Sequence, residues 1–143
     1  MDKKVVLVSH GHLAEGVANA VEMVFGKNDA LAHYGLTPDG NVVELIQSLC
    51  AEVEANEQIQ YVILADIFGG SVCNQCLQRL SACDNVKLVA GLNMALVLGI
   101  LSIPGALSNE QLAQAIEEAR EGIREVELIR ADAPVDDGAD DFF

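Results

Sequence analysis

Val5-Val6-Leu7-Val8-Ser9-His10-Gly11-His12-Leu13 is the stretch of sequence that decides the fold. Its first four residues form a continuous β-branched and aliphatic run, which is typical of a parallel strand buried on both faces. Gly11 follows the polar end of that run, and apolar residues then recur every three or four positions from 13 to 25. The pattern predicts a strand followed by a helix that ends at Gly26.

The same alternation continues along the chain. Apolar strands are predicted at 31–36, 61–65 and 86–92, and helices at 41–53, 72–82, 94–103 and 108–123. Asn41 with Glu44, and Ser108 with Gln111, have the spacing of helix-capping pairs. Strands alternating with helices predict an α/β fold, with a mainly parallel sheet of about four strands and helices on both faces. Residues 126–129 are the candidate for a fifth, edge strand.

The length of the chain limits the number of domains, and its net charge limits the classes of molecule that it can bind. The chain has 143 residues, of which 51% are apolar, and this fits one domain with a sizeable core. We assign residues 1–131 to that domain and residues 132–143 to an acidic tail that is predicted to be disordered. The formal net charge of −14 argues against nucleic acid or an anionic membrane surface as a partner and favours a basic protein.

Short apolar runs and few cysteines indicate the compartment. The run at 94–103 is too short to span a bilayer, and the apolar start of the chain is too short for a signal peptide. We therefore expect a cytoplasmic protein. Its four cysteines, Cys50, Cys73, Cys76 and Cys83, are then predicted to be free thiols.

The candidate site lies where the first and third predicted strands end. His10 closes the first strand, and Asp66 with the loop of Gly69, Gly70 and Ser71 follows the third. Carboxyl ends of parallel strands share one edge, where ligands bind. A carboxylate that accepts the Nδ1 proton of an imidazole leaves Nε2 as a nucleophile, and amides at a helix N-terminus attract a phosphoryl group. We predict that His10 and Asp66 are catalytic and that the loop binds phosphate, with no metal and no cofactor.

At these residues a resemblance to a known family becomes specific. Residues 8–16, the segment Asp66-Ile67-Phe68-Gly69-Gly70-Ser71 with Asn74 after it, and Ala90-Gly91-Leu92-Asn93 resemble signatures of the mannose-family EIIA domains of the bacterial phosphoenolpyruvate-dependent sugar phosphotransferase system. The resemblance extends from residue 5 to about 129. Val72 departs from it, because the family usually has proline there, and so does the Met94-Ala95-Leu96 that follows Asn93. These departures leave the subfamily open.

The resemblance implies both a function and a set of partners. A member of this family is a cytoplasmic phosphotransferase that accepts a phosphoryl group from phospho-HPr, here on His10, and passes it to a IIB component, which serves the membrane components IIC and IID. The resemblance gives Asp66 the role of orienting His10 and places Ser71 near the phosphate. It also implies a homodimer in which residues 126–129 pair with the sheet of the partner.

Other functions remain open from the sequence. A regulatory or accessory phosphocarrier, such as the EIIA-like part of the dihydroxyacetone kinase system, would keep the fold and His10 without sugar uptake. A pure interaction module would keep the fold without a reactive histidine. Cys73-x-x-Cys76 has the spacing of a redox pair, and Asp66 follows a strand as a receiver-domain aspartate does. A histidine phosphatase would need arginine before His10, and a hydrolase would need a nucleophile elbow around Ser71.

Overall fold

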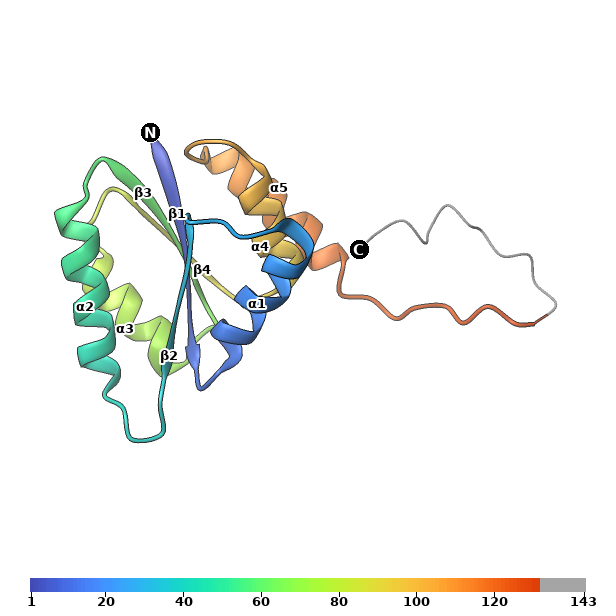
Figure 1. Ribbon diagram of the computed structural model, residues 1–143, viewed down its shortest axis with the longest axis horizontal. Helices are drawn as coiled ribbons and strands as arrows, with labels where there is room; N and C mark the ends of the chain where they lie inside the picture. Colours follow the sequence, from blue (N-terminus) through green and yellow to red (C-terminus); the bar gives the residue numbers. More distant parts are fainter. Residues whose placement is uncertain (132–143) are drawn as a thin grey trace.

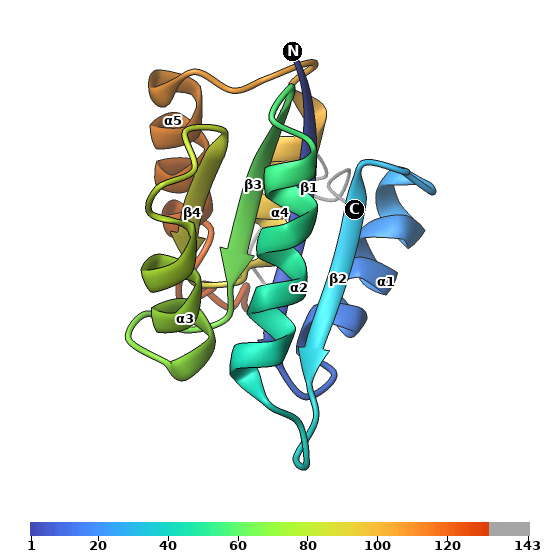
Figure 2. The same ribbon diagram turned by 90° about the vertical axis from the view of Figure 1, so that its left-hand side faces the viewer.

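The computed structural model describes residues 1–131, and its elements follow the predicted order. They are β1 (Asp2–His10), α1 (Leu13–Phe25), β2 (Leu31–Leu36), α2 (Val42–Ala55), β3 (Ile59–Ala65), α3 (Ser71–Leu80), β4 (Val86–Ala90), α4 (Met94–Ser102) and α5 (Asn109–Glu121). The strands form one parallel sheet in the order β2-β1-β3-β4. Helices α1, α4 and α5 cover one face and α2 and α3 the other (Figures 1 and 2), which confirms the α/β prediction.

The continuous apolar run of β1 lies at the centre of the molecule. Val5 and Leu7 face the layer of α1, α4 and α5, whereas Val6 and Val8 face the layer of α2 and α3. All four side chains are fully buried. Burial of one such side chain contributes about 1.5–3 kcal/mol, so β1 alone ties both helix layers to the sheet. The carboxyl end of this strand is therefore a firmly held position in the fold.

Both predicted capping residues begin their helices. The Asn41 side chain accepts the main-chain N–H groups of residues 43 and 44 at 2.9 and 3.3 Å and so begins α2. Ser108 and Gln111 form the full reciprocal pair at the start of α5, with hydrogen bonds of 2.9 and 3.1 Å. Such caps satisfy main-chain donors that the first helical turn leaves without partners.

Three strand boundaries differ from the prediction. β1 begins at Asp2, before the apolar run that starts at Val5, and β3 begins at Ile59, earlier than predicted. β4 ends at Ala90 instead of residue 92.

The early end of β4 has a local cause, because Gly91 adopts a φ of +100°, which turns the chain out of the extended conformation. After this turn the Leu92 main-chain N–H donates to the Asp66 carbonyl at 3.3 Å, next to the end of β3.

A polar network lies between the sheet and α2. The Glu52 carboxylate pairs with the Lys4 ammonium and accepts the hydroxyl groups of Tyr34 and Tyr61 at 3.1 and 3.3 Å. Burial by itself raises the pKa of Glu52, but the hydrogen bonds and the charge of Lys4 outweigh burial and hold that pKa below its usual value. The network therefore favours the charged form of Glu52 at neutral pH.

The predicted fifth strand does not form within one chain. Residues 126–129 have no regular secondary structure, and the side chains of Val126, Leu128 and Ile129 are exposed. Their pairing with a second copy stays a prediction. The acidic tail, 132–143, lies outside the described residues. Within residues 1–131, none of the helices is both long enough and apolar enough to cross a membrane.

Candidate functional site around His10

Parallel pairing of β1 with β3 brings His10 and Asp66 to the same edge of the sheet. Val8 stands opposite Ala65 in the register, and the Asp66 main-chain N–H donates to the Val8 carbonyl at 3.1 Å. His10 is the last residue of β1, and Asp66 follows β3 directly. Residues far apart in the sequence are thus placed side by side by the sheet itself.

The Asp66 carboxylate holds His10 at two points. Its Oδ2 accepts the His10 main-chain N–H at 2.8 Å and lies 2.7 Å from the ring Nδ1, while Oδ1 accepts the Ile67 N–H at 3.0 Å. Burial alone would raise the pKa of Asp66, but the hydrogen bonds from the His10 main chain and ring lower it below its usual value. The carboxylate is therefore charged at neutral pH and favours a proton on Nδ1.

This arrangement leaves the other ring nitrogen available. The His10 side chain is 50% exposed, whereas that of Asp66 is 8% exposed. With the proton on Nδ1, Nε2 carries a lone pair, and the Ser71 hydroxyl lies 3.2 Å from it. An exposed imidazole nitrogen with an oriented ring can attack an electrophile that arrives from solution.

The glycine loop that follows Asp66 shapes the space beside the ring. Gly69 has a φ of +80°, and its carbonyl accepts the Asn74 side-chain amide at 3.1 Å. A Cβ at Gly70 would lie 2.6 Å from Ile67 Cγ2 and 3.7 Å from His10 Cε1. The first distance is too short for a real contact and the second is an ordinary one, so the absence of a side chain at Gly70 makes room for Ile67 beside the His10 ring.

The loop differs in one respect from the predicted phosphate site. The Gly70 N–H already donates to the Ile67 carbonyl at 3.2 Å, so this amide is engaged within the loop. Ser71 begins α3, and the first-turn amides of that ten-residue helix point toward the loop side. The helix N-terminus and the Ser71 hydroxyl, rather than the Gly70 amide, are the donors available to an anion.

Sequence reasoning missed two features that position His10. Ser9 is fully buried, and its hydroxyl accepts the Ala14 N–H at 2.8 Å, which fixes the start of α1 against the end of β1. Gly35 on β2 lies close to the turn that follows β1, because a Cβ at Gly35 would be 2.2 Å from the Gly11 carbonyl oxygen. The position of Ser9 directly after an apolar strand was a sequence signal for its bond to the start of α1. The close approach of Gly35 to Gly11 joins segments that are distant in sequence, so it leaves no local pattern.

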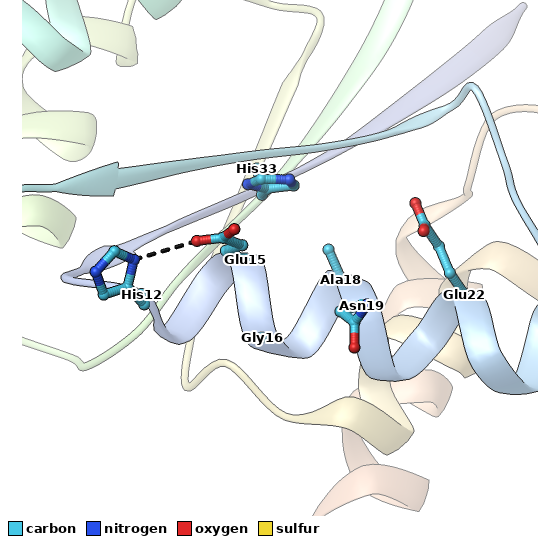
Figure 3. A pocket seen from close by; sticks show the side chains of 7 residues that line it. All are labelled: His12, Glu15, Gly16, Ala18, Asn19, Glu22 and His33. Atoms are coloured by element: carbon cyan, nitrogen blue, oxygen red, sulfur yellow. Dashed lines mark hydrogen bonds and ion pairs between the residues drawn. The ribbon is translucent and has the colours of Figure 1, made fainter.

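The other histidines lie in a separate shallow groove of about 400 Å³ between α1 and β2 (Figure 3). His12 contacts Glu15 there at 3.1 Å through Nδ1, and His33 and Glu22 also line it. Neither His10 nor Asp66 is among the lining residues. Throughout residues 1–131, no three histidine, cysteine or acidic side chains are arranged to hold a metal ion.

The four cysteines are free thiols, as predicted. Cys73 and Cys76 are buried on α3, in the apolar layer shared with α2. Burial raises the pKa of Cys76 to about 12. A redox pair depends on a thiolate, so burial of this kind disfavours that reading of the motif.

Comparison with known proteins agrees with this architecture. A family described as the PTS system fructose IIA component, EIIA-man, matches residues 4–123. A sorbose-specific EIIA component of the phosphotransferase system from Lacticaseibacillus casei is 23% identical over 118 residues, which are 82% of this chain and 86% of that protein. The mannose-specific EIIAB component of Escherichia coli K12 is 25% identical over 123 residues, which are 84% of this chain but 38% of that longer protein.

A solved structure gives the same result in three dimensions. The IIA protein associated with the fucose utilization operon of Streptococcus pneumoniae superimposes with a TM-score of 0.77 at 26% identity, covering 87% of this chain and 93% of that one. The family match extends from residue 4, within β1, to beyond the end of α5, and so contains His10, Asp66 and Ser71. The chain belongs to the mannose-family EIIA components of the sugar phosphotransferase system.

Proposed function

We propose that the protein is a phosphocarrier in which His10 Nε2 accepts a phosphoryl group from phospho-HPr and passes it to a IIB component. The observation that carries this proposal is the pairing of His10 Nδ1 with the Asp66 carboxylate at 2.7 Å, because in the neutral ring it places the proton on Nδ1 and the lone pair on the exposed Nε2. In the first transfer a P–N bond forms at Nε2 while the P–N bond of the donor breaks, and the donor imidazole leaves with the electron pair. The second transfer repeats this exchange with His10 as the leaving group.

Each neighbour of His10 has a role in that exchange. Attack through Nε2 places positive charge on the ring, and the Asp66 carboxylate stabilises it through Nδ1. The Ser71 hydroxyl lies 3.2 Å from Nε2 at the N-terminus of α3, and both supply donors for the oxygens of a phosphoryl group bound at Nε2. Phosphoryl transfer needs mainly alignment and charge stabilisation, and both are supplied by residues already held in place.

The named relatives support sugar transport as the purpose of the transfer. They are described as sorbose-specific and mannose-specific components, and the mannose-specific one combines A and B units in one chain. We infer that the present protein acts in the cytoplasm and delivers phosphate to a IIB unit that serves membrane components IIC and IID. The sugar itself is a property of those partners in this proposal.

A homodimer belongs to the same proposal. β4 is an edge strand of the sheet, and residues 126–129 include three exposed apolar side chains, Val126, Leu128 and Ile129. An apolar segment of this kind is stabilised by pairing with an open sheet edge, and a second copy offers such an edge. Sedimentation of the full chain, compared with a chain truncated after residue 125, tests this arrangement.

The phosphocarrier proposal is tested by labelling. The protein is incubated with radiolabelled phosphoenolpyruvate, enzyme I and HPr, and the expected product is an acid-labile, alkali-stable label on the parent protein and its absence from His10→Ala. The matched controls His12→Ala and His33→Ala alter the two other histidines, which line the separate groove, and both should be labelled like the parent. A label retained in His10→Ala would refute His10 as the acceptor, and an unlabelled parent would favour an interaction module.

A further inference from the structure

A serine hydroxyl, an imidazole and a carboxylate are linked in that order at the carboxyl edge of the sheet. The Ser71 hydroxyl lies 3.2 Å from His10 Nε2, and the Asp66 Oδ2 lies 2.7 Å from Nδ1 on the other side of the same ring. Serine hydrolases use these three groups in this order to make a serine nucleophilic, and the arrangement is recognised by its geometry rather than by its sequence positions. The site therefore contains a second potential nucleophile, the Ser71 oxygen.

Both distances suit the transfer of a proton through the ring. A nucleophile and its base lie about 2.6–3.2 Å apart in such sites, and often further apart before the substrate binds. The Asp66 carboxylate favours the proton on Nδ1, so Nε2 has the lone pair that can accept the proton of the Ser71 hydroxyl. The same carboxylate stabilises the positive charge that the ring then carries.

The position of Ser71 in the chain supplies donors for an oxyanion. Ser71 is the first residue of α3, and the Asn74 N–H is the one that donates to the Gly70 carbonyl, at 2.9 Å. The N–H groups of residues 71–73 precede that bond and have no helical acceptor. Gly70-Ser71-Val72 lacks the second glycine of a nucleophile elbow, but an elbow also uses the N–H of the residue after its serine, and Val72 provides that group here.

We propose that the unphosphorylated protein has a second activity, the hydrolysis of small activated esters with Ser71 as the nucleophile. His10 Nε2 removes the hydroxyl proton while Oγ of Ser71 forms a bond to the acyl carbon, and the alcohol leaves with the electron pair of its C–O bond and the proton from Nε2. A water molecule then gives a proton to Nε2 and attacks the acyl carbon. The carboxylic acid is released, and the Ser71 oxygen leaves with the electron pair and takes the proton back.

The exposure of the site indicates the class of ester. The His10 side chain is 50% exposed and Ser71 is also exposed, so an ester reaches both directly from solution. A short acyl group with a good leaving group suits such an open site. Under the proposed phosphocarrier function, a phosphoryl group on Nε2 would use the lone pair that Ser71 needs, so ester hydrolysis belongs to the unphosphorylated protein.

The test uses p-nitrophenyl acetate as the substrate and a fluorophosphonate as a probe that stays bound to a reactive serine. Ser71→Ala and His10→Ala are each expected to lower the protein-dependent release of p-nitrophenolate at least about 10²-fold, and Asp66→Asn about 10²- to 10⁴-fold. Peptide mass spectrometry should find the fluorophosphonate adduct on Ser71 of the parent and not in His10→Ala. The control Ser102→Ala removes another exposed hydroxyl, which donates to the Gly99 carbonyl at 2.7 Å in α4, and should keep the parental rate.

The outcomes distinguish Ser71 from His10 as the nucleophile. A Ser71→Ala protein that hydrolyses the ester at the parental rate overturns the proposal, because His10 would then react with the ester directly. A parent that releases p-nitrophenolate no faster than buffer, or that carries the adduct on a residue other than Ser71, also overturns it. The adduct on the parent is measured without any substitution, and circular dichroism shows that the variants are folded. None of these results bears on transfer from phospho-HPr, which the labelling experiment tests separately.

Discussion

Replacing Asp66 with asparagine changes one carboxylate oxygen into an amide nitrogen at nearly constant shape. In the parent, Oδ2 accepts the His10 main-chain N–H at 2.8 Å and lies 2.7 Å from Nδ1, while Oδ1 accepts the Ile67 N–H at 3.0 Å. Asparagine has a single oxygen, so its amide nitrogen must face a donor at one of these two positions. A hydrogen bond to a charged group contributes about 1.5–3 kcal/mol, and we expect the free energy of unfolding to fall by about that amount.

The effect on transfer should exceed the effect on stability. Without the carboxylate charge, the ring loses both the preference for a proton on Nδ1 and the stabilisation of its positive charge during attack. In hydrolytic triads the same exchange of aspartate for asparagine costs up to about 10⁴ in rate, and we expect His10 to lose about 10²- to 10⁴-fold, or about 3–5 kcal/mol of activation free energy. Single-turnover rapid quench at saturating phospho-HPr measures the rate, and urea unfolding followed by circular dichroism measures the stability.

Glu15→Gln is the matched control, because it makes the same chemical change in a carboxylate 3.1 Å from the His12 ring. Its transfer rate should stay within about threefold of the parent. The reasoning would be refuted by an Asp66→Asn protein that is folded and transfers phosphate at the parental rate. It would also fail if both variants slowed equally, because a general loss of negative charge would then explain the result.

Gly35→Ala places a Cβ 2.2 Å from the Gly11 carbonyl oxygen, so its urea midpoint should fall by the equivalent of about 1–3 kcal/mol, and an unchanged midpoint would contradict the close approach. Gly99→Ala meets no atom within 4 Å inside α4 and should gain about 0.5–1 kcal/mol in the same assay; a loss would show that this helix position is not free. The pKa of Glu52 is lowered in the folded protein beside Lys4. The Glu52 carboxylate therefore contributes to the free energy of unfolding above its ordinary pKa of about 4.3, and this contribution is lost as the pH falls through the lower pKa of the folded protein. Glu52→Gln should therefore show a shallower loss of stability below about pH 4.5 than the parent, and identical acid profiles would exclude this role.

The fold could be predicted because its strongest signals are local. The run of β1 is continuous, and Asn41 and Ser108 begin their helices through side-chain bonds to main-chain groups close in sequence. The fifth strand, which was predicted but does not form within one chain, depends instead on contacts that the local sequence does not contain. Residues 126–129 have the composition of a strand, but a strand needs a neighbour, and a single chain places none beside them.

The candidate site was predictable in its members and less so in its geometry. His10, Asp66 and Ser71 were placed together because parallel strand ends share an edge, and their distances agree with that reasoning. The engaged amide of Gly70 could not be predicted, because it depends on how tightly the loop turns back on Ile67. The contact of Gly35 with the β1 end likewise depends on the packing of segments that are far apart in sequence.

The double hold of one Asp66 oxygen on the main chain and the ring of His10 has a consequence for the order of events in transport. A histidine that is held at a sheet edge through both its main chain and its ring has little freedom to move between two partners. Under the proposed phosphocarrier function, donor and acceptor therefore bind at the same nitrogen in turn, and one has to dissociate before the other can bind. Under that proposal the rate of transfer depends on how fast the two partner proteins exchange, so an excess of dephosphorylated donor or of free acceptor is expected to slow transfer by occupying the surface at His10.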